Sequence, residues 1–148
     1  KLMGIDANPH TINYANTLSE NYPNIEFKAI DIFSEAFKTL KYDLVLTTLF
    51  LHHFKNDELV TFLKPVLEKA KLGIVVNDLH RHKLAYYLFK LLSITIKNKT
   101  IVQDGLTSVL RGFNRKELEV ISQRLDSNYQ IHWKWAFRFQ WILKHKKI

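Results

Sequence analysis

The chain has 148 residues, no cysteine and a formal net charge of +8, and 47% of its residues are apolar. A chain of this length can bury about 70% of its unfolded surface, which is enough for a core without stabilising disulfides or metals. The lack of cysteine excludes disulfides, thiolate catalysis and iron–sulfur clusters, and it fits a cytoplasmic protein. We therefore expect one domain over residues 1–148, with no internal boundary.

Short apolar runs alternate with amphipathic segments through the first half of the chain. Four runs are predicted to be strands: 1–6, 24–31, 42–49 and 72–79. One helix is predicted from Pro9 to about residue 21 with Asn8 as its N-cap, and another begins with a cap at Asn56 and is kinked at Pro65. The runs 42–49 and 72–79 are nearly continuous in apolar residues, as in strands buried on both faces. This alternation predicts an α/β fold with a mostly parallel sheet.

The last third of the chain has a different pattern. A helix is predicted near 81–97, followed by a loop over 98–108. A further helix starts at Asn114, where Glu117 stands three positions on, as in a capping box. Two period-2 runs over 129–146 predict an antiparallel hairpin that closes the sheet.

Polar residues follow the predicted strands, where ligands bind in open α/β sheets. Asp6 ends the first run, and a carboxylate at such a position commonly accepts from both hydroxyls of a ribose. Asp31 ends the next run and would suit an adenine amino group, so the pair indicates an adenosine site. The alternative for Asp6 is that it merely ends a strand or caps the following helix.

These motifs together resemble a known family. The segments GIDANPHTINYAN, IEFKAIDIF, YDLVLTTLFLHHF and LGIVVNDLHRH have the order and strand context of class I S-adenosylmethionine-dependent methyltransferases, most like the ubiquinone- and menaquinone-biosynthesis branch of small-molecule enzymes. The resemblance implies a Rossmann-like sheet whose first strand and glycine-rich loop would precede Lys1, so that residues 1–148 are an N-terminally incomplete methyltransferase domain. It also implies S-adenosylmethionine as cofactor, with these contact residues: Asp6, Ala7, Asp31, Ile32, Thr47 and Leu49.

Histidines and arginines supply the candidate acceptor site. A histidine can take a proton from a phenol or enol during methyl transfer, and His53 and His80 are the predicted catalytic residues. The predicted substrate-binding residues are His52, Arg81, His82 and Arg111. For the histidines the alternative is a structural or solvent-facing role, and for Arg111 it is an ion pair with Asp104. The histidine spacings do not predict a metal site.

Residues 80–113 are expected to form a cap on the substrate side of the domain. The strongly apolar segment 84–96, with its interleaved aromatic residues, suggests an apolar or aromatic acceptor, although core or homodimer packing would explain it equally well. The basic residues around this segment leave a peripheral membrane contact open.

The predicted function is therefore methyl transfer from S-adenosylmethionine to a small, apolar or aromatic acceptor, at oxygen or carbon. The alternatives are a nicotinamide-dependent oxidoreductase and a non-catalytic Rossmann-like binding module. A nucleic-acid methyltransferase is disfavoured, because residues 47–50 read TTLF rather than the Asn/Asp-Pro-Pro-aromatic run that amino-directed enzymes of that type carry. Cytosine-carbon enzymes need a cysteine, which the chain lacks.

Overall fold

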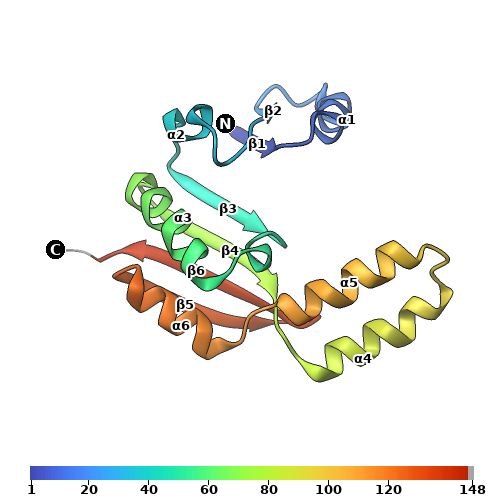
Figure 1. The fold of residues 1–148 in the computed structure, drawn as a ribbon. Coiled ribbons are helices and arrows are strands. Elements are labelled where there is room, and N and C mark those ends of the chain that lie inside the picture. The colour runs from blue at the N-terminus through green and yellow to red at the C-terminus, as the bar shows by residue number, and fades with distance from the viewer. Residues whose placement is uncertain (147–148) are drawn as a thin grey trace. The chain divides into compact units, whose positions relative to one another are not determined.

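The computed structural model describes residues 1–146 and divides the chain into two compact units, 1–41 and 42–148. Both units are mixed arrangements of strands and helices (Figure 1). Each is described by itself below.

The first unit is a parallel strand pair with two helices. In chain order its elements are β1 (Leu2–Asp6), α1 (Pro9–Ser19), β2 (Ile25–Ala29) and α2 (Glu35–Thr39). The strands pair in parallel with Asp6 opposite Ala29. As predicted, α1 begins at Pro9, and the Asn8 side chain accepts a hydrogen bond from the N–H of His10.

The second unit is built on a four-stranded mixed sheet in the order β3-β4-β6-β5. Its elements are β3 (Leu44–Thr48), η1 (Leu51–His53), α3 (Asn56–Lys69), β4 (Gly73–Leu79), α4 (Lys83–Leu92), η2 (Ser93–Thr95), α5 (Lys99–Arg111), α6 (Arg115–Arg124), β5 (Ser127–Lys134) and β6 (Arg138–His145). The strands β3 and β4 are parallel, and the β5–β6 hairpin is antiparallel to its neighbours. The structure thus confirms the predicted α/β class and the C-terminal antiparallel hairpin.

The core of the second unit lies on the sheet face that α3 and α6 cover. Alternate residues of β4 and β6 point to this face, because side chains alternate along a strand. Trp141 of β6 is fully buried there, and its indole N–H donates to the Ser122 hydroxyl of α6 at 2.9 Å. The Asn114 cap and the Glu117 capping box of α6 are present as predicted.

The helices after β4 differ from the prediction. The helix expected over 81–97 ends at Leu92, and the expected loop 98–108 is most of α5, which Asn98 caps by accepting from the N–H groups of Thr100 and Ile101. In Figure 1, α4 and α5 run side by side away from the sheet. Gly105 of α5 permits this, because a Cβ there would lie 2.3 Å from the Phe89 ring of α4.

Two smaller expectations also fail. The cap of α3 is at Lys55 rather than Asn56, since the Glu58 carboxylate reaches back to accept from the Lys55 N–H at 3.1 Å. The strand β3 is not buried on both faces: Leu44 and Leu46 are exposed, whereas Val45 and Thr47, which point to the other face, are half-buried. Among residues 1–146, no helix is long and apolar enough to cross a membrane.

Candidate functional site

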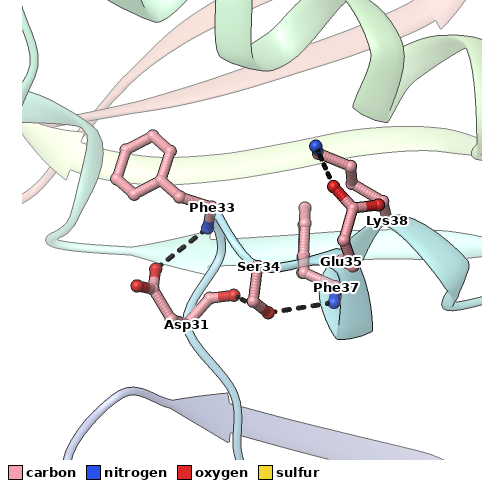
Figure 2. Close-up of polar contacts among 6 residues, drawn as sticks. All are labelled: Asp31, Phe33, Ser34, Glu35, Phe37 and Lys38. Atoms are coloured by element: carbon pink, nitrogen blue, oxygen red, sulfur yellow. Dashed lines mark hydrogen bonds and ion pairs between the residues drawn. The ribbon is translucent and has the colours of Figure 1, made fainter.

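Two carboxylates follow neighbouring parallel strands of the first unit. Asp6 is the last residue of β1, and Asp31 comes two residues after β2. Both are exposed, and each holds the following turn with one oxygen. Asp6 Oδ1 accepts from the Asn8 N–H at 2.7 Å. Asp31 Oδ1 accepts from the Phe33 N–H at 2.9 Å, as Figure 2 shows.

This arrangement leaves the second oxygen of each carboxylate accessible. Within the described residues, no hydrogen bond or ion pair uses Oδ2 of Asp6 or Asp31. A fixed carboxylate with an open oxygen is suited to accept from a ligand hydroxyl or amino group. The pair therefore fits an adenosine-like ligand, and Ala7 and Ile32 stand beside it in the chain, exposed and half-buried respectively.

The turn after Asp31 is itself firmly built. The Ser34 hydroxyl donates to the Asp31 carbonyl at 2.6 Å, and the Phe37 N–H donates to the Ser34 hydroxyl at 3.3 Å, which caps α2 (Figure 2). These bonds fix the backbone from which the Asp31 carboxylate projects. The sequence analysis did not predict α2, although Ser34 followed by Glu35 is an ordinary helix start.

A buried histidine–aspartate pair lies at the carboxyl ends of β3 and β4. His52 Nδ1 is 2.6 Å from Asp78 Oδ1, and both side chains are buried. Asp78 Oδ2 also accepts from the backbone N–H groups of Phe50 and Leu51 at 3.2 and 2.8 Å. Because the carboxylate is the acceptor in all these bonds, Nδ1 of His52 is the donor. The pair locks η1 onto the end of β4.

Sequence reasoning missed the role of Asp78, although a signal was available. Ile74, Val76 and Asp78 alternate along β4 and share its buried face. An acidic residue at a strand position that faces the core needs a hydrogen-bond partner, and a histidine of a neighbouring segment can donate that bond.

The neighbouring His53 is exposed, and its ring packs against that of His52 at a tilt of 36°, with ring centroids 4.3 Å apart. Partial burial lowers the pKa of the His53 imidazole, and the positive fields of His52 and Arg111 lower it further, while Asp78 acts in the opposite direction. Arg111 lies in the last turn of α5, which packs against η1. The structure thus brings Arg111 near His53, and no ion pair joins it to Asp104 within residues 1–146.

His80 and His82 lie among aromatic rings just after β4. The His80 ring is 4.6 Å from that of Phe139, and the His82 ring stacks on Phe137 at 5.2 Å. Burial chiefly lowers the pKa of His80, with a smaller contribution from His82, and the buried Nδ1 of His80 has no hydrogen-bond partner in the described chain. His82 caps α4, since its Nδ1 accepts from the Leu84 N–H at 3.1 Å.

The three remaining predicted residues, Arg81, Thr47 and Leu49, have different surroundings. Arg81 forms an ion pair with Glu117 of α6, the same residue that closes the capping box. Thr47 shares the helix-covered face of the sheet with its register partner Val76, and its buried hydroxyl has no partner in the described residues. Leu49 is exposed and adopts a positive φ of 52° just beyond β3.

The comparisons with known proteins agree with this geometry. Residues 1–71 match the family model described as a methyltransferase domain. No curated protein sequence matches the chain.

Solved methyltransferases share the fold of the whole domain. The plantazolicin methyltransferase BpumL, crystallised with a triazolic desmethylPZN analog and S-adenosylhomocysteine (SAH), superposes with a TM-score of 0.72 at 18% identity over 99% of this chain and 68% of its own. Magnesium protoporphyrin IX methyltransferase from Synechocystis PCC 6803, with bound SAH, has a TM-score of 0.60 at 14% identity over 96% of this chain and 63% of its own. A putative O-methyltransferase from Nostoc punctiforme gives 0.62 at 17% identity, covering 97% of this chain and 44% of its own.

The structural matches confirm the predicted Rossmann-like methyltransferase fold, and the family match covers residues 1–71. The ubiquinone- and menaquinone-biosynthesis branch stays a prediction.

Proposed function

We propose that this protein transfers the methyl group of S-adenosylmethionine to an oxygen or carbon of a small, apolar or aromatic acceptor. The observation that carries the proposal is the pair of open carboxylates at Asp6 and Asp31, on neighbouring parallel strands of the segment that matches the methyltransferase domain. Similar proteins are named for plantazolicin and magnesium protoporphyrin IX, which supports an acceptor other than nucleic acid.

In the first unit, Asp6 is proposed to accept from the ribose hydroxyls and Asp31 from the adenine amino group. Ala7 and Ile32 are the proposed neighbours of the adenine ring. In the second unit, Thr47 and Leu49 are proposed as further cofactor contacts. When bound, the cofactor supplies an electrophilic methyl group, and the chain's own residues hold the acceptor and take its proton.

We assign proton acceptance to His53 and His80. A histidine accepts a proton only when it is neutral, and the lowered pKa of each ring keeps it neutral near pH 7. His53 is the more accessible of the two, and we propose that His52, which Asp78 holds in place, positions it through their ring contact. A positively charged Arg111 near His53 would also favour an acceptor oxygen that gains negative charge.

The aromatic surroundings of His80 and His82 support an acceptor with a flat or apolar body. Phe137, Phe139 and Trp133 offer ring faces and edges at this end of the sheet. His82 and the guanidinium of Arg81 are proposed to contact polar groups of the acceptor, although Glu117 already engages Arg81. His52 was also predicted to bind substrate. Because its side chain is buried, we propose that it instead positions the ring of His53.

The test is isothermal titration of SAH into the protein and into two variants, Asp6→Asn and Asp31→Asn. Each variant keeps the size of the side chain but removes a charged acceptor, so each is expected to weaken binding about ten- to a hundred-fold. Asp43→Asn, an exposed acid of the second unit, is the matched control and is expected to bind SAH as the unaltered protein does. Binding of NAD instead of SAH, or equal SAH affinity in all variants, would contradict the proposal.

A further inference from the structure

The helix α4 presents an apolar stripe that no other element of the second unit covers. Five exposed residues form this α4 stripe: Leu84, Tyr87, Leu88, Leu91 and Leu92. Their spacing of i, i+3, i+4, i+7 and i+8 places them on one face of the helix. Ile94 of η2, which is 78% exposed, continues the stripe toward the turn between α4 and α5.

The α4 stripe is not the face by which α4 packs on the rest of the protein. The buried Ala85 and the half-buried Phe89 lie on the other side, where the Phe89 ring meets Gly105 of α5. The helix α4 is therefore apolar on two sides but packs on only one of them, so its second apolar side is available to bind another surface. Exposed apolar patches of this kind mark sites of interaction with proteins or membranes.

The charges beside the stripe are all of one sign. Between residues 81 and 103 there is no Asp or Glu, whereas Lys83, Lys90, Lys97 and Lys99 fall in this segment. Lys83 and Lys90 are seven positions apart and therefore flank the stripe on the same side of α4. Within the described residues, no ion pair engages these four lysines.

This charge pattern favours one of the two surfaces that could bury the stripe, an anionic bilayer, over the other, a second copy of the chain. A second copy of the chain would bring one set of lysines toward another, and residues 81–103 contain no carboxylate to pair with them. An anionic bilayer matches both features of this surface. Its acyl region accepts the leucines, and its phosphate headgroups attract the lysines. An apolar face bordered by lysines is the usual form of a helix that lies in a membrane interface.

We propose that the α4 stripe and its flanking lysines dock the protein on the surface of an anionic membrane, with α4 lying in the interface. The inference does not depend on the proposed methyl transfer. If both are correct, the acceptor is drawn from compounds that partition into membranes.

The test is co-sedimentation of the purified protein with vesicles of phosphatidylcholine alone and with vesicles of equal parts phosphatidylcholine and phosphatidylglycerol. We expect binding to the anionic vesicles only, weakened by high salt. The double variant Leu91→Gln/Leu92→Gln should lower partitioning by about ten-fold or more, because it removes the apolar anchor. The double variant Lys83→Gln/Lys90→Gln should lower it by roughly twenty-five-fold, at about five-fold for each lysine.

Matched controls separate the stripe from general surface changes. Leu91 and Leu92 are 63% and 70% exposed, and the control pair Leu18→Gln/Leu72→Gln changes leucines that are 64% and 63% exposed elsewhere. Lys64→Gln/Lys134→Gln removes the same charge from α3 and β5. Both controls should bind vesicles as the unaltered protein does, and circular dichroism establishes that every variant is folded.

Three results would overturn the inference. The first is failure of the folded protein to sediment with anionic vesicles, and the second is binding of both stripe variants as strong as that of their controls. In the third, light scattering would show a dimer that Leu91→Gln/Leu92→Gln dissociates, which would mean that a second copy covers the stripe. SAH titration of the same variants reports separately on the proposed function, so failure of one proposal is distinguishable from failure of the other.

Discussion

Asp78 illustrates how one buried residue organises the candidate site. Its carboxylate accepts from His52 and from the backbone N–H groups of Phe50 and Leu51, and it is 1% exposed. Asp78 Oδ1 also accepts from the Leu79 N–H at 2.7 Å, so removing the carboxylate leaves four buried or part-buried donors without this acceptor. We therefore expect Asp78→Ala to lower the free energy of unfolding by about 3–5 kcal/mol, and Asp78→Asn, which keeps one acceptor oxygen, to cost less.

Urea denaturation followed by the fluorescence of the buried Trp141 measures this change. Asp43→Ala is the control, because Asp43 makes only an exposed ion pair with Lys71, and it should leave the unfolding midpoint unchanged. An unchanged midpoint for Asp78→Ala would mean that the buried pair does not stabilise the fold.

The titration of His53 depends on its charged neighbours. Burial, His52 and Arg111 lower its pKa, so we expect the ring to titrate below the ordinary histidine value of 6.5. Arg111→Gln removes a positive field and should raise the pKa, whereas Arg115→Gln removes the same charge from α6 and should not. Nuclear magnetic resonance of the imidazole protons measures both. A pKa that does not move in Arg111→Gln would place Arg111 too far away to favour a negatively charged acceptor.

At the scale of elements, Gly73 determines how β4 joins β6. It has a φ of +117°, and a Cβ there would lie 2.1 Å from the Leu143 carbonyl oxygen. Gly73→Ala must therefore strain the backbone and push two paired strands apart. We expect it to destabilise the protein by about 3 kcal/mol or more.

Thermal unfolding of Gly73→Ala and of Leu72→Ala tests this expectation at adjacent positions. Leu72 is exposed, so its truncation should change the unfolding temperature little. Equal unfolding temperatures for the two variants would mean that the backbone shifts at little cost to accommodate a Cβ at Gly73, which would contradict the expectation.

The helices after β4 show where local patterns fail. Residues 98–108 contain Thr100, Val102 and Gly105, which have weak helix propensity, and this favoured a loop. In the structure they form α5, because packing against α4 outweighs that propensity. Asn98 was an available signal, since asparagine is a preferred N-cap.

At the scale of the whole molecule, the two units differ sharply in how much core they have. Among the described residues, Ile12 is the one buried apolar residue of the first unit, and all the others belong to the second. A segment of about 40 residues with so little burial is marginal by itself. We expect amides of β1 and β2 to exchange with solvent much faster than those of β4 and β6.

Hydrogen exchange followed by mass spectrometry checks this difference. Addition of SAH is then expected to slow exchange around Asp6 and Asp31, because ligand binding stabilises the bound form. Equal protection of both strand pairs without ligand would contradict the expectation.

The stability of the molecule should also depend on pH through His53 and His80. Both have a lowered pKa in the folded state, so below about pH 6.5 the unfolded chain binds more protons than the folded one. Their contribution to stability is therefore complete above that pH and is lost as the pH falls below it. Urea unfolding between about pH 7 and 5 should show this loss, and His53→Gln/His80→Gln should reduce it.

The sequence by itself determined most of the succession of strands and helices, although not α2 or α5. It also determined the caps at Asn8 and Asn114 and the acids that end the first two strand runs. Those features depend on periodicity and on residues adjacent in the chain, so a linear pattern contains them. Only the tertiary structure decided that Asp78 holds His52, that Arg111 comes near His53, and that α4 and α5 form a pair whose outer stripe stays exposed. These contacts join residues 26 to 58 positions apart or depend on which helix face is covered, and no local pattern encodes either.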